Sequence, residues 1–152
     1  MKLDLLLADT ARVAEGKLDA LGIGWALTVA GASYAVCGVV HVPWDQAAER
    51  HSLVLELIDG DGEPFSFPEH DEPAMWTFQQ DVSLRETANP QVKPGTALTW
   101  PFVLNANGFP LEEDTLYVWR ASIDGHHEEG WTRPFRTLPA IANPSDPETE
   151  SG

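Results

Sequence analysis

The chain has 152 residues, of which 43% are apolar, 24 are acidic and 9 are basic, for a net charge of −15. This length predicts one domain, and the negative charge argues against binding to nucleic-acid phosphates or to an anionic membrane. The single cysteine, Cys37, excludes an internal disulfide framework and a four-cysteine zinc site.

The first strands are predicted at the N-terminus. An opening strand runs from Leu3 to about Thr10, and a turn at Ala14–Lys17 joins it to a second strand near Lys17–Trp25. Asp4 and Asp9 leave too short an apolar run for an export signal, which needs about 7 to 15 residues. Together with the lone cysteine, this predicts a cytoplasmic location.

The next segment, from Ala20 to Trp44, contains no formally charged residue. Within it, Leu21–Val40 is long enough to cross a bilayer as a helix. Four glycines interrupt this stretch, however, and its flanks Asp19 and Asp45 are acidic where a membrane anchor would be basic. We therefore expect two buried strands that meet at the small-residue turn 30–33.

Short strands also account for the middle and the end of the chain. Turn residues bound a strand over Ser52–Ile58, which ends at Asp59–Gly62, and a last hairpin, which starts at Asp124–Gly125 and returns through Trp131–Thr137. Alternation of apolar and polar residues predicts further strands over 76–84, 98–104 and 117–123. Pro101 lacks an N–H, which places its strand at a sheet edge or at a bulge.

One helical turn and one tail complete the expected elements. The helical candidate is Asp45–Arg50, with Pro43 before it and Asp45 as its N-cap. From Pro139 onward the chain is rich in Pro, Asn, Ser and Glu. We expect a single β-sandwich domain over residues 1–138 and a disordered acidic tail over residues 139–152.

The number and spacing of these strands are typical of an all-β protein, either an antiparallel sandwich or a barrel. The segment Glu113–Trp119 favours an immunoglobulin-like sandwich, because an acidic turn precedes Tyr117 as in the tyrosine corner of those domains. We therefore predict an antiparallel immunoglobulin-like β-sandwich of about eight to nine strands with one short helical turn.

The turns and strand ends of four different segments together make up a pattern: Leu5–Trp25, Val42–Asp45, Leu55–Gly62 and Trp119–Gly125. In this pattern the chain resembles a family of small β-sandwich proteins known as domain of unknown function 6941. The resemblance covers most of residues 3–137 and lies in turns and core positions. It implies a small β-sandwich, carries no activity with it, and assigns a role to no residue.

No group of side chains in the sequence matches a metal site well. His126 and His127 lie beside two glutamates, but adjacent histidines on a strand point to opposite faces. Asp59 and Asp61 partly match a calcium loop, although His70 stands at the twelfth position, where Glu is required, so a hairpin turn is the better interpretation. We expect no bound metal and no cofactor, and the weak metal candidates are His126, His127, Asp59 and Asp61.

Catalytic motifs are absent from the sequence as well. Cys37 and His41, four residues apart on a strand, would lie about 13 Å apart, too far for a nucleophile and its base. The chain has no Gly-x-Ser-x-Gly elbow, no phosphate-binding loop and no dinucleotide fingerprint. We assign no catalytic and no cofactor-binding residue, which leaves enzymatic activity undecided and favours a protein that is not an enzyme.

The six tryptophans could form a core or a binding surface. Trp76, Trp100 and Trp119 share strand faces with other apolar residues and are expected in the core. Trp44 and Trp131 lie at the ends of segments and are the candidates for a surface binding site.

The leading hypothesis is a non-enzymatic cytoplasmic β-sandwich that acts through contact with a protein partner. The net charge lies in four acidic segments without Lys or Arg, where a basic partner or a cation would be sought: 59–72, 112–114, 124–129 and 146–150. The alternatives are a metal-assisted small-molecule enzyme that uses loop histidines and acids, an acidic mimic of nucleic acid and, last, a sugar-binding module. Acidic loops that serve only solubility are the simplest interpretation of the charge.

Overall fold

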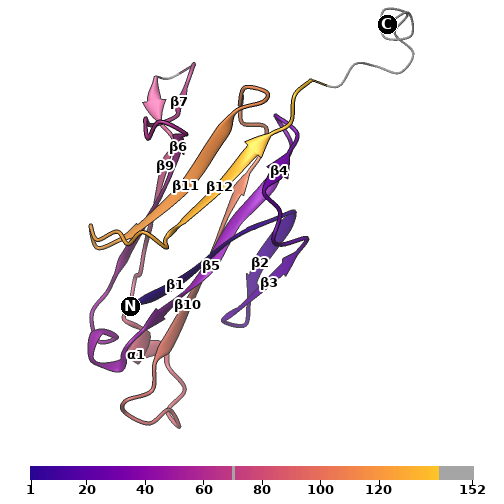
Figure 1. Cartoon of the computed structure of the whole chain (residues 1–152). Coiled ribbons are helices and arrows are strands. Elements are labelled where there is room, and N and C mark those ends of the chain that lie inside the picture. The colour runs from indigo at the N-terminus through magenta and orange to yellow at the C-terminus, as the bar shows by residue number, and fades with distance from the viewer. Residues whose placement is uncertain (70, 141–152) are drawn as a thin grey trace, which may run out of the picture.

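The computed structural model describes residues 1–69 and 71–140, which form twelve strands, one 3-10 turn and one four-residue helix (Figure 1). The longer strands are β1 (Lys2–Ala8), β5 (Tyr34–Val42), β6 (Ser52–Asp59), β10 (Leu98–Ala106), β11 (Leu116–Ile123) and β12 (Thr132–Thr137). The shorter strands are β2 (Thr10–Ala14), β3 (Lys17–Leu21), β4 (Leu27–Thr28), β7 (Ser66–Phe67), β8 (Glu72–Pro73) and β9 (Met75–Gln79). The turn η1 is Trp44–Gln46, and the helix α1 is Leu84–Thr87. The prediction of an all-β protein is confirmed.

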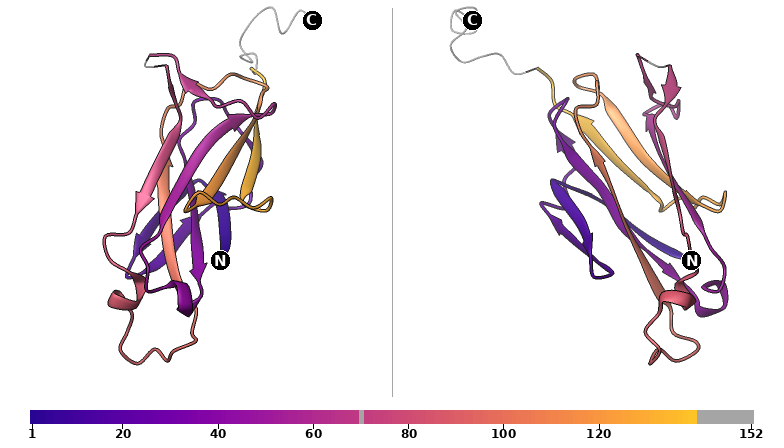
Figure 2. Two further views of the ribbon diagram at one scale, coloured as in Figure 1. Left: turned by 90° about the vertical axis from the view of Figure 1, so that its left-hand side faces the viewer. Right: turned by 180° about the vertical axis from the view of Figure 1, so that it is seen from behind.

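Two larger sheets contain the long strands. The three-stranded sheet has the order β1-β5-β10, and the five-stranded sheet has the order β4-β12-β11-β6-β9. Neighbouring strands are antiparallel, except β4 and β12, which are parallel. The two sheets face each other (Figure 2), and one cluster of buried side chains from both of them fills the space between.

Strand alternation explains how this core forms. On β1 every second residue faces the five-stranded sheet, and Leu3, Leu5 and Leu7 are buried there. On β11 the predicted apolar face is confirmed, since all four of its residues are buried: Tyr117, Trp119, Ala121 and Ile123. Burial of each large apolar side chain stabilises the fold by about 1.5–3 kcal/mol, so these facing rows hold the two sheets together.

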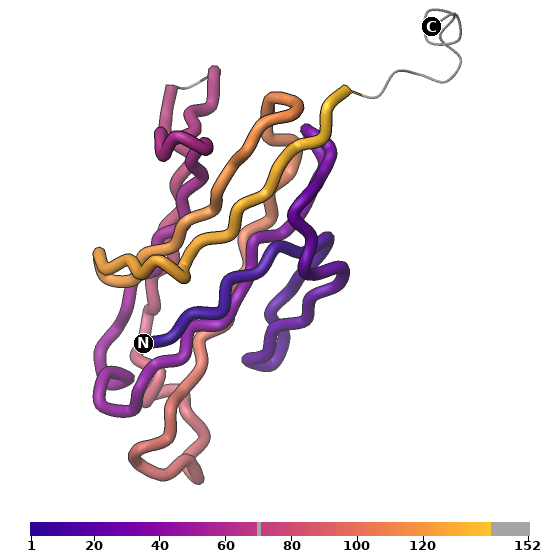
Figure 3. Tube along the Cα trace, in the orientation of Figure 1, coloured from indigo at the N-terminus to yellow at the C-terminus, as the bar shows by residue number. Residues whose placement is uncertain are grey.

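A third layer covers the outer face of the three-stranded sheet. The chain leaves β1 at Asp9 and forms the hairpin β2–β3, which lies against β5 and β10 (Figures 2 and 3). Ala35 and Cys37 on β5 point away from the central core, yet both are fully buried. The hairpin therefore shields this face, and Cys37 is a buried free thiol beneath it. Cys37 is buried as expected, although in this outer layer rather than between the sheets.

The strand that contains Pro101 lies at a sheet edge, as predicted. Within the described residues β10 pairs only with β5, and Pro101 lies opposite Val39. The missing N–H of proline is tolerated there because an edge strand needs ladder bonds on one side only.

The expectation of two buried strands in the uncharged segment is only half correct. β5 is buried as expected, but residues 22–29 contribute only the two-residue β4, and Leu21, Ile23 and Val29 are exposed. Gly22 and Gly24 have positive φ angles, which bend the chain before it can extend. A run of apolar residues without alternation therefore did not distinguish an exposed connection from a buried strand. In the described part of the chain, no helix is long and apolar enough to cross a membrane.

The predicted short helical turn is present, but the expected bounds Asp45–Arg50 and the expected N-cap Asp45 are wrong. η1 begins at Trp44, with Pro43 at its N-cap and without a side-chain cap. The turn is held from outside, because Nε of Arg85 donates a hydrogen bond to the carbonyl O of Trp44 at 2.9 Å. The guanidinium of Arg85 also lies 4.5 Å from the centre of the Trp44 ring. This support comes from a distant segment, so the local sequence did not reveal it.

The strand predicted over 76–84 is shorter than expected. It ends at Gln79, and Ser83 then begins α1 through a capping box with Glu86. The box pairs the Ser83 hydroxyl with the N–H of Glu86 and the Glu86 carboxylate with the N–H of Ser83. This local signal outweighs the apolar residues that continue the alternation.

The predicted tight turns are confirmed. Glu15 and Gly16 have φ angles of 54° and 72°, and Asp124 and Gly125 have φ angles of 51° and 81°. Positive φ at both central residues is what a two-residue hairpin turn of type I′ requires.

The number of strands is larger than the predicted eight to nine, because the structure also contains β4, β7 and β8, which have only two residues each. The predicted disordered tail lies, from residue 141 onward, outside the described residues.

Candidate functional site: the outer face of the five-stranded sheet

The five-stranded sheet has an outer face that no described element covers (Figure 2). Because side chains alternate along a strand, the residues between the buried ones point away from the core. Strand pairing arranges these residues in rows across the sheet. We call this surface the outer sheet face, and it consists of Leu27, Val54, Glu56, Ile58, Met75, Thr77, Leu116, Val118, Arg120, Ser122, Thr132, Pro134 and Arg136.

An apolar row crosses the middle of the outer sheet face. Ile58 on β6, Val118 on β11 and Pro134 on β12 lie directly opposite one another. Ile58 and Val118 are half-buried by their neighbours, while Pro134 is exposed. This row is continuous over three strands, so it presents apolar surface to solvent without interruption by a charge.

Larger apolar side chains stand around this row. Leu27, Met75 and Leu116 are exposed on 59%, 53% and 36% of their surface. Leu27 and Leu116 flank Arg136 from β4 and β11, whereas Met75 lies on the opposite edge strand, β9. These three side chains add to the apolar surface that the row exposes on this side of the sheet.

The sequence contains a signal for this face. An antiparallel sheet with one solvated face alternates strictly between apolar and polar residues. β6 departs from that rule, since Val54 and Ile58 occupy outward positions between the buried leucines. β11 departs from it at Leu116 and Val118. Alternation used only to locate the core passes over these outward apolar residues.

The two arginines of the outer sheet face are paired with acids. Nε of Arg120 lies 3.5 Å from Oε1 of Glu56 in the same row of the sheet. Nη1 of Arg136 lies 3.4 Å from Oδ1 of Asp114 and donates a hydrogen bond to the carbonyl O of Asp114 at 3.2 Å. The middle of the face is therefore locally neutral, although the chain as a whole carries a charge of −15.

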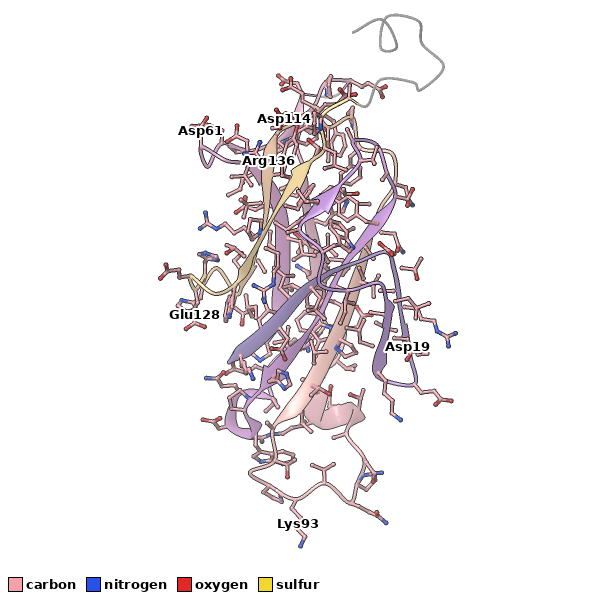
Figure 4. All side chains as sticks on the ribbon, turned by 45° about the vertical axis from the view of Figure 1, so that its right-hand side comes forward. Asp19, Asp61, Lys93, Asp114, Glu128 and Arg136 are labelled. Carbon is pink, nitrogen blue, oxygen red and sulfur yellow. The ribbon has the colours of Figure 1, made fainter. Side chains whose placement is uncertain are left out.

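Acidic side chains gather at the two ends of the five-stranded sheet instead. Segments 59–63 and 112–114 lie at the end where β11 begins, and segment 124–129 lies at the end where β11 finishes. Figure 4 shows Asp61 and Asp114 at one of these ends and Glu128 at the other. The eight residues of β11 span about 26 Å at about 3.3 Å per residue, so the two groups of acids are well separated.

Asp59 uses its carboxylate to shape a turn. Oδ1 of Asp59 accepts hydrogen bonds from the N–H of Asp61 at 2.9 Å and from the N–H of Glu63 at 3.0 Å. Gly62 has a φ angle of 85°, as expected for a tight turn. The interpretation of this segment as a hairpin turn is confirmed.

His127 bonds to the backbone of the last hairpin beside a bulge. Residues 127–130 bulge out between β11 and β12, because the pairing of Ile123 with His126 is out of step with that of Arg120 with Thr132. Nδ1 of His127 donates a hydrogen bond to the carbonyl O of Ala121 at 2.8 Å, where the bulge interrupts the strand pairing. The His127 side chain therefore replaces a backbone donor that the bulge has moved away from β11.

The four weak metal candidates do not come together. Asp59 and Asp61 lie at one end of the five-stranded sheet, and His126 and His127 lie at the other. Over residues 1–69 and 71–140, no three His, Cys, Asp or Glu side chains are grouped so that they could hold a metal ion.

A buried histidine that sequence reasoning did not single out lies near His126. Nδ1 of His51 lies 2.6 Å from Oδ2 of Asp124, and Nε2 lies 2.7 Å from the carbonyl O of Gln46. Both neighbours are acceptors, so both ring nitrogens must donate, which only the charged imidazolium can do. Burial lowers the pKa of His51, but the hydrogen bonds to Asp124 and Gln46 and the charges of Asp124 and Glu49 outweigh it, so this pKa lies above its ordinary value.

The pair His51–Asp124 borders a small cleft of about 350 Å³, which Glu49, His126 and Trp131 also line. Both oxygens of Asp124 are occupied, since Oδ1 accepts the N–H of Ser52 at 2.9 Å. Every polar atom of the pair has a partner within the fold, so the pair connects three segments of the chain.

The two tryptophans predicted at the surface differ in outcome. Trp44, on η1, is half-buried, and the guanidinium of Arg85 from α1 lies over its ring. The prediction that Trp131 lies at the surface is wrong, because this residue is buried and belongs to the hydrophobic core. The bulge before β12 turns it inward, where its ring meets the edge of His126 with ring centres 5.6 Å apart. Among the tryptophans expected in the core, Trp119 is fully buried, and Trp76 and Trp100 pack against the core as half-buried residues.

Two other reactive groups offer no catalytic arrangement. Burial raises the pKa of Cys37 to about 11, which keeps its thiol protonated. His41 lies with Nε2 2.8 Å from Oδ2 of Asp4, at an exposed position on the three-stranded sheet. The His41–Asp4 pair and the Cys37 thiol do not form the hydrogen-bonded nucleophile and base that covalent catalysis requires.

Together, these features define an all-β domain with two facing sheets, a covering hairpin and an outer sheet face whose apolar row is open to solvent. Residues 3–136 match the family of unknown function DUF6941, and the chain therefore belongs to this family, as its turn pattern predicted. No curated protein and no solved structure matches the chain.

Proposed function

We propose that the protein is a non-enzymatic contact module that binds a protein partner through the outer sheet face. The observation that carries this proposal is the asymmetry of the two sheets. The outer face of the three-stranded sheet is covered by the hairpin β2–β3, whereas the outer sheet face shows the row Ile58–Val118–Pro134 to solvent. A partner that covers this row would gain the hydrophobic stabilisation that the fold itself leaves unused.

The charge distribution specifies the chemistry of the partner. A locally neutral apolar middle favours an apolar contact, and acids at both ends, such as Asp61 and Glu128, attract positive charge. The fitting partner therefore presents an apolar surface bordered by Lys and Arg. Its approach would be accelerated by long-range attraction to a chain with a net charge of −15.

The corner at Tyr117 supports an immunoglobulin-like form of the sandwich. The hydroxyl O of Tyr117 accepts a hydrogen bond from the N–H of Glu112 at 2.9 Å, and a bond from this tyrosine to the backbone a few residues upstream is also a feature of the tyrosine corner. Domains of this class commonly recognise proteins through sheet faces and loops. A cytoplasmic location remains part of the proposal, on the basis of the single free cysteine.

The alternative functions have less support. A metal-assisted enzyme would use His126, His127 and the neighbouring acids, but His127 is bonded to the backbone of Ala121, and in the described part of the chain no three such side chains are grouped to hold a metal ion. A nucleic-acid mimic needs acids aligned in a stripe, whereas the acids at the two ends are separated by the neutral outer sheet face.

The test is site-specific photo-cross-linking in the cells that produce the protein. A benzophenone amino acid replaces Leu116 in one variant and Val13 in a second, matched variant. Val13 is 45% exposed but lies on the hairpin β2–β3, on the far side of the molecule. We expect one basic protein to be captured from position 116 and not from position 13.

The captured protein is then tested with purified components. We expect Leu27→Ser and Leu116→Ser each to weaken binding about tenfold, the effect of losing one good apolar contact, and Val13→Ser to leave it unchanged. The proposal is overturned by equal capture from both positions, by an acidic partner, or by capture of nothing. Cross-links between two copies of this chain would show self-association and would also overturn it.

A further inference from the structure

A second surface lies at the end of the five-stranded sheet where β11 begins. It is a cleft of about 620 Å³ between residues 67–69, at the end of β7, and the loop that joins β10 to β11. We call it the loop cleft, and it is lined by Phe67, Pro68, Glu69, Asn107, Gly108, Phe109 and Pro110. It involves no residue of the outer sheet face.

Aromatic rings form the wall of the loop cleft, and the core holds them in place. Phe109 stacks on Trp76, with ring centres 5.5 Å apart and planes 5° apart. Phe67 meets Phe109 edge to face, with ring centres 5.3 Å apart and planes 87° apart. The ring centre of Trp76 in turn lies 5.6 Å from the ring centre of Trp119, which is fully buried. The two phenylalanines therefore present a fixed apolar surface rather than two mobile side chains.

The backbone of both loops is also constrained. Phe67 is paired with Glu72 in the hairpin β7–β8, and its carbonyl O accepts the N–H of Asp71 at 2.8 Å. The N–H of Leu111 donates to the carbonyl O of Phe109 at 2.8 Å. Gly108 has a φ angle of 65°, a conformation in which a side chain would be strained. The site is formed before any ligand arrives, which lowers the entropic cost of binding.

The polar groups at the rim indicate what would bind. Asn107 is an exposed amide, which can donate to the carbonyl groups of an extended peptide. Glu69 supplies a carboxylate, and Glu112 and Glu113 follow Pro110 closely in the chain. A cationic side chain would therefore be favoured beside the aromatic wall.

We propose that the loop cleft binds a proline-rich peptide in the polyproline II conformation, with Arg or Lys next to its prolines. Proline rings pack well on fixed aromatic side chains, and this helix leaves its carbonyl groups free for donors such as the Asn107 amide. The peptide is already extended in solution, so little conformational entropy is lost on binding. The proposal does not depend on the function of the outer sheet face.

The test uses the full-length protein and three fluorescein-labelled peptides, followed by fluorescence anisotropy. The first peptide repeats Pro-Pro-Arg, the second replaces proline by alanine, and the third replaces arginine by glutamate. We expect saturable binding of the first peptide and at least about tenfold weaker binding of the other two. The tryptophan fluorescence of the protein should change as the first peptide saturates the cleft, because Trp76 stacks behind Phe109.

Two protein variants locate the binding. Glu69→Lys reverses a charge in the loop cleft, and Glu129→Lys makes the same change at the far end of the sheet. We expect the first variant to weaken binding about tenfold and the second to change it little. Phe109→Leu keeps an apolar side chain and removes the ring, and it should weaken binding while the circular dichroism spectrum stays native.

Several outcomes would overturn the proposal. They are the absence of saturable binding by the Pro-Pro-Arg peptide, equal binding of the alanine or glutamate peptide, and equal losses in Glu69→Lys and Glu129→Lys, which would show attraction to the whole chain. Displacement of the peptide by simple sugars at similar concentrations would identify a glycan site instead.

Discussion

Asp124 holds the imidazolium of His51 from a position 73 residues further along the chain, with Oδ2 and Nδ1 2.6 Å apart. The same histidine donates to the carbonyl O of Gln46 on η1, and the same aspartate accepts from the N–H of Ser52. One charged pair therefore joins the start of β6, the turn between β11 and β12, and η1. Because the pair depends on a proton, the stability of this end of the fold depends on pH.

The first prediction concerns this pH dependence. The pKa of His51 is raised in the folded state, so the folded chain keeps the proton at pH values where the unfolded chain has released it. The stabilisation is complete below the unfolded pKa of about 6.5 and is lost as pH rises through the higher folded pKa. Urea unfolding from pH 5.5 to pH 9 should therefore give a free energy of unfolding that falls over this window.

Asp124→Asn provides the control for this effect. It should cost about 1.5–3 kcal/mol at pH 6, where a hydrogen bond between charged groups is lost, and less at pH 9. Its free energy of unfolding should vary less with pH than that of the wild type. An unchanged pH profile in this variant would mean that other groups cause the dependence.

Sequence reasoning located the strands well because strand formation here is a local property. The alternation in β11 and the turn residues Asp124–Gly125 are visible in short windows of sequence. The partners of those strands are set by packing over long distances, and the bond from His51 to Asp124 belongs to that class. Alternation also cannot show whether an outward apolar residue such as Val118 will be covered by a further layer, so the sequence signal alone did not identify the candidate site.

The second prediction concerns Gly38, at the centre of β5. A Cβ atom at this position would overlap the carbonyl O of Asp4 and would lie 2.8 Å from Cζ of Phe102. Gly38→Ala should therefore destabilise the fold by about 1–3 kcal/mol, as overpacking does. Gly130→Ala is the matched control, because no atom lies within 4 Å of its Cβ position and its φ is not positive. Urea unfolding of both variants measures the difference, and equal stabilities would contradict the close approach of β1 to β5.

The third prediction concerns the thiol of Cys37 beneath the hairpin β2–β3. Its pKa of about 11 makes the thiolate at pH 8 roughly a hundredfold scarcer than that of an ordinary cysteine. Burial should slow its reaction with a disulfide reagent further. In Val13→Cys, the introduced thiol is exposed on the same hairpin and should react in a fast phase, with Cys37 in a slow one. Two fast phases would mean that the hairpin does not cover β5 in solution.

The fourth prediction concerns the hydroxyl of Tyr117, which accepts the N–H of Glu112 at 2.9 Å. Tyr117→Phe keeps the buried ring, which stacks on Phe135 with centres 5.8 Å apart, and removes this one bond. The free energy of unfolding should fall by about 0.5–1.5 kcal/mol, the usual net value of a hydrogen bond. Amide exchange at Glu112 should accelerate in the variant, while exchange in β11 should change only with the global stability. If Tyr117→Phe is as stable as the wild type and exchange at Glu112 is unchanged, the corner does not fasten this loop to β11.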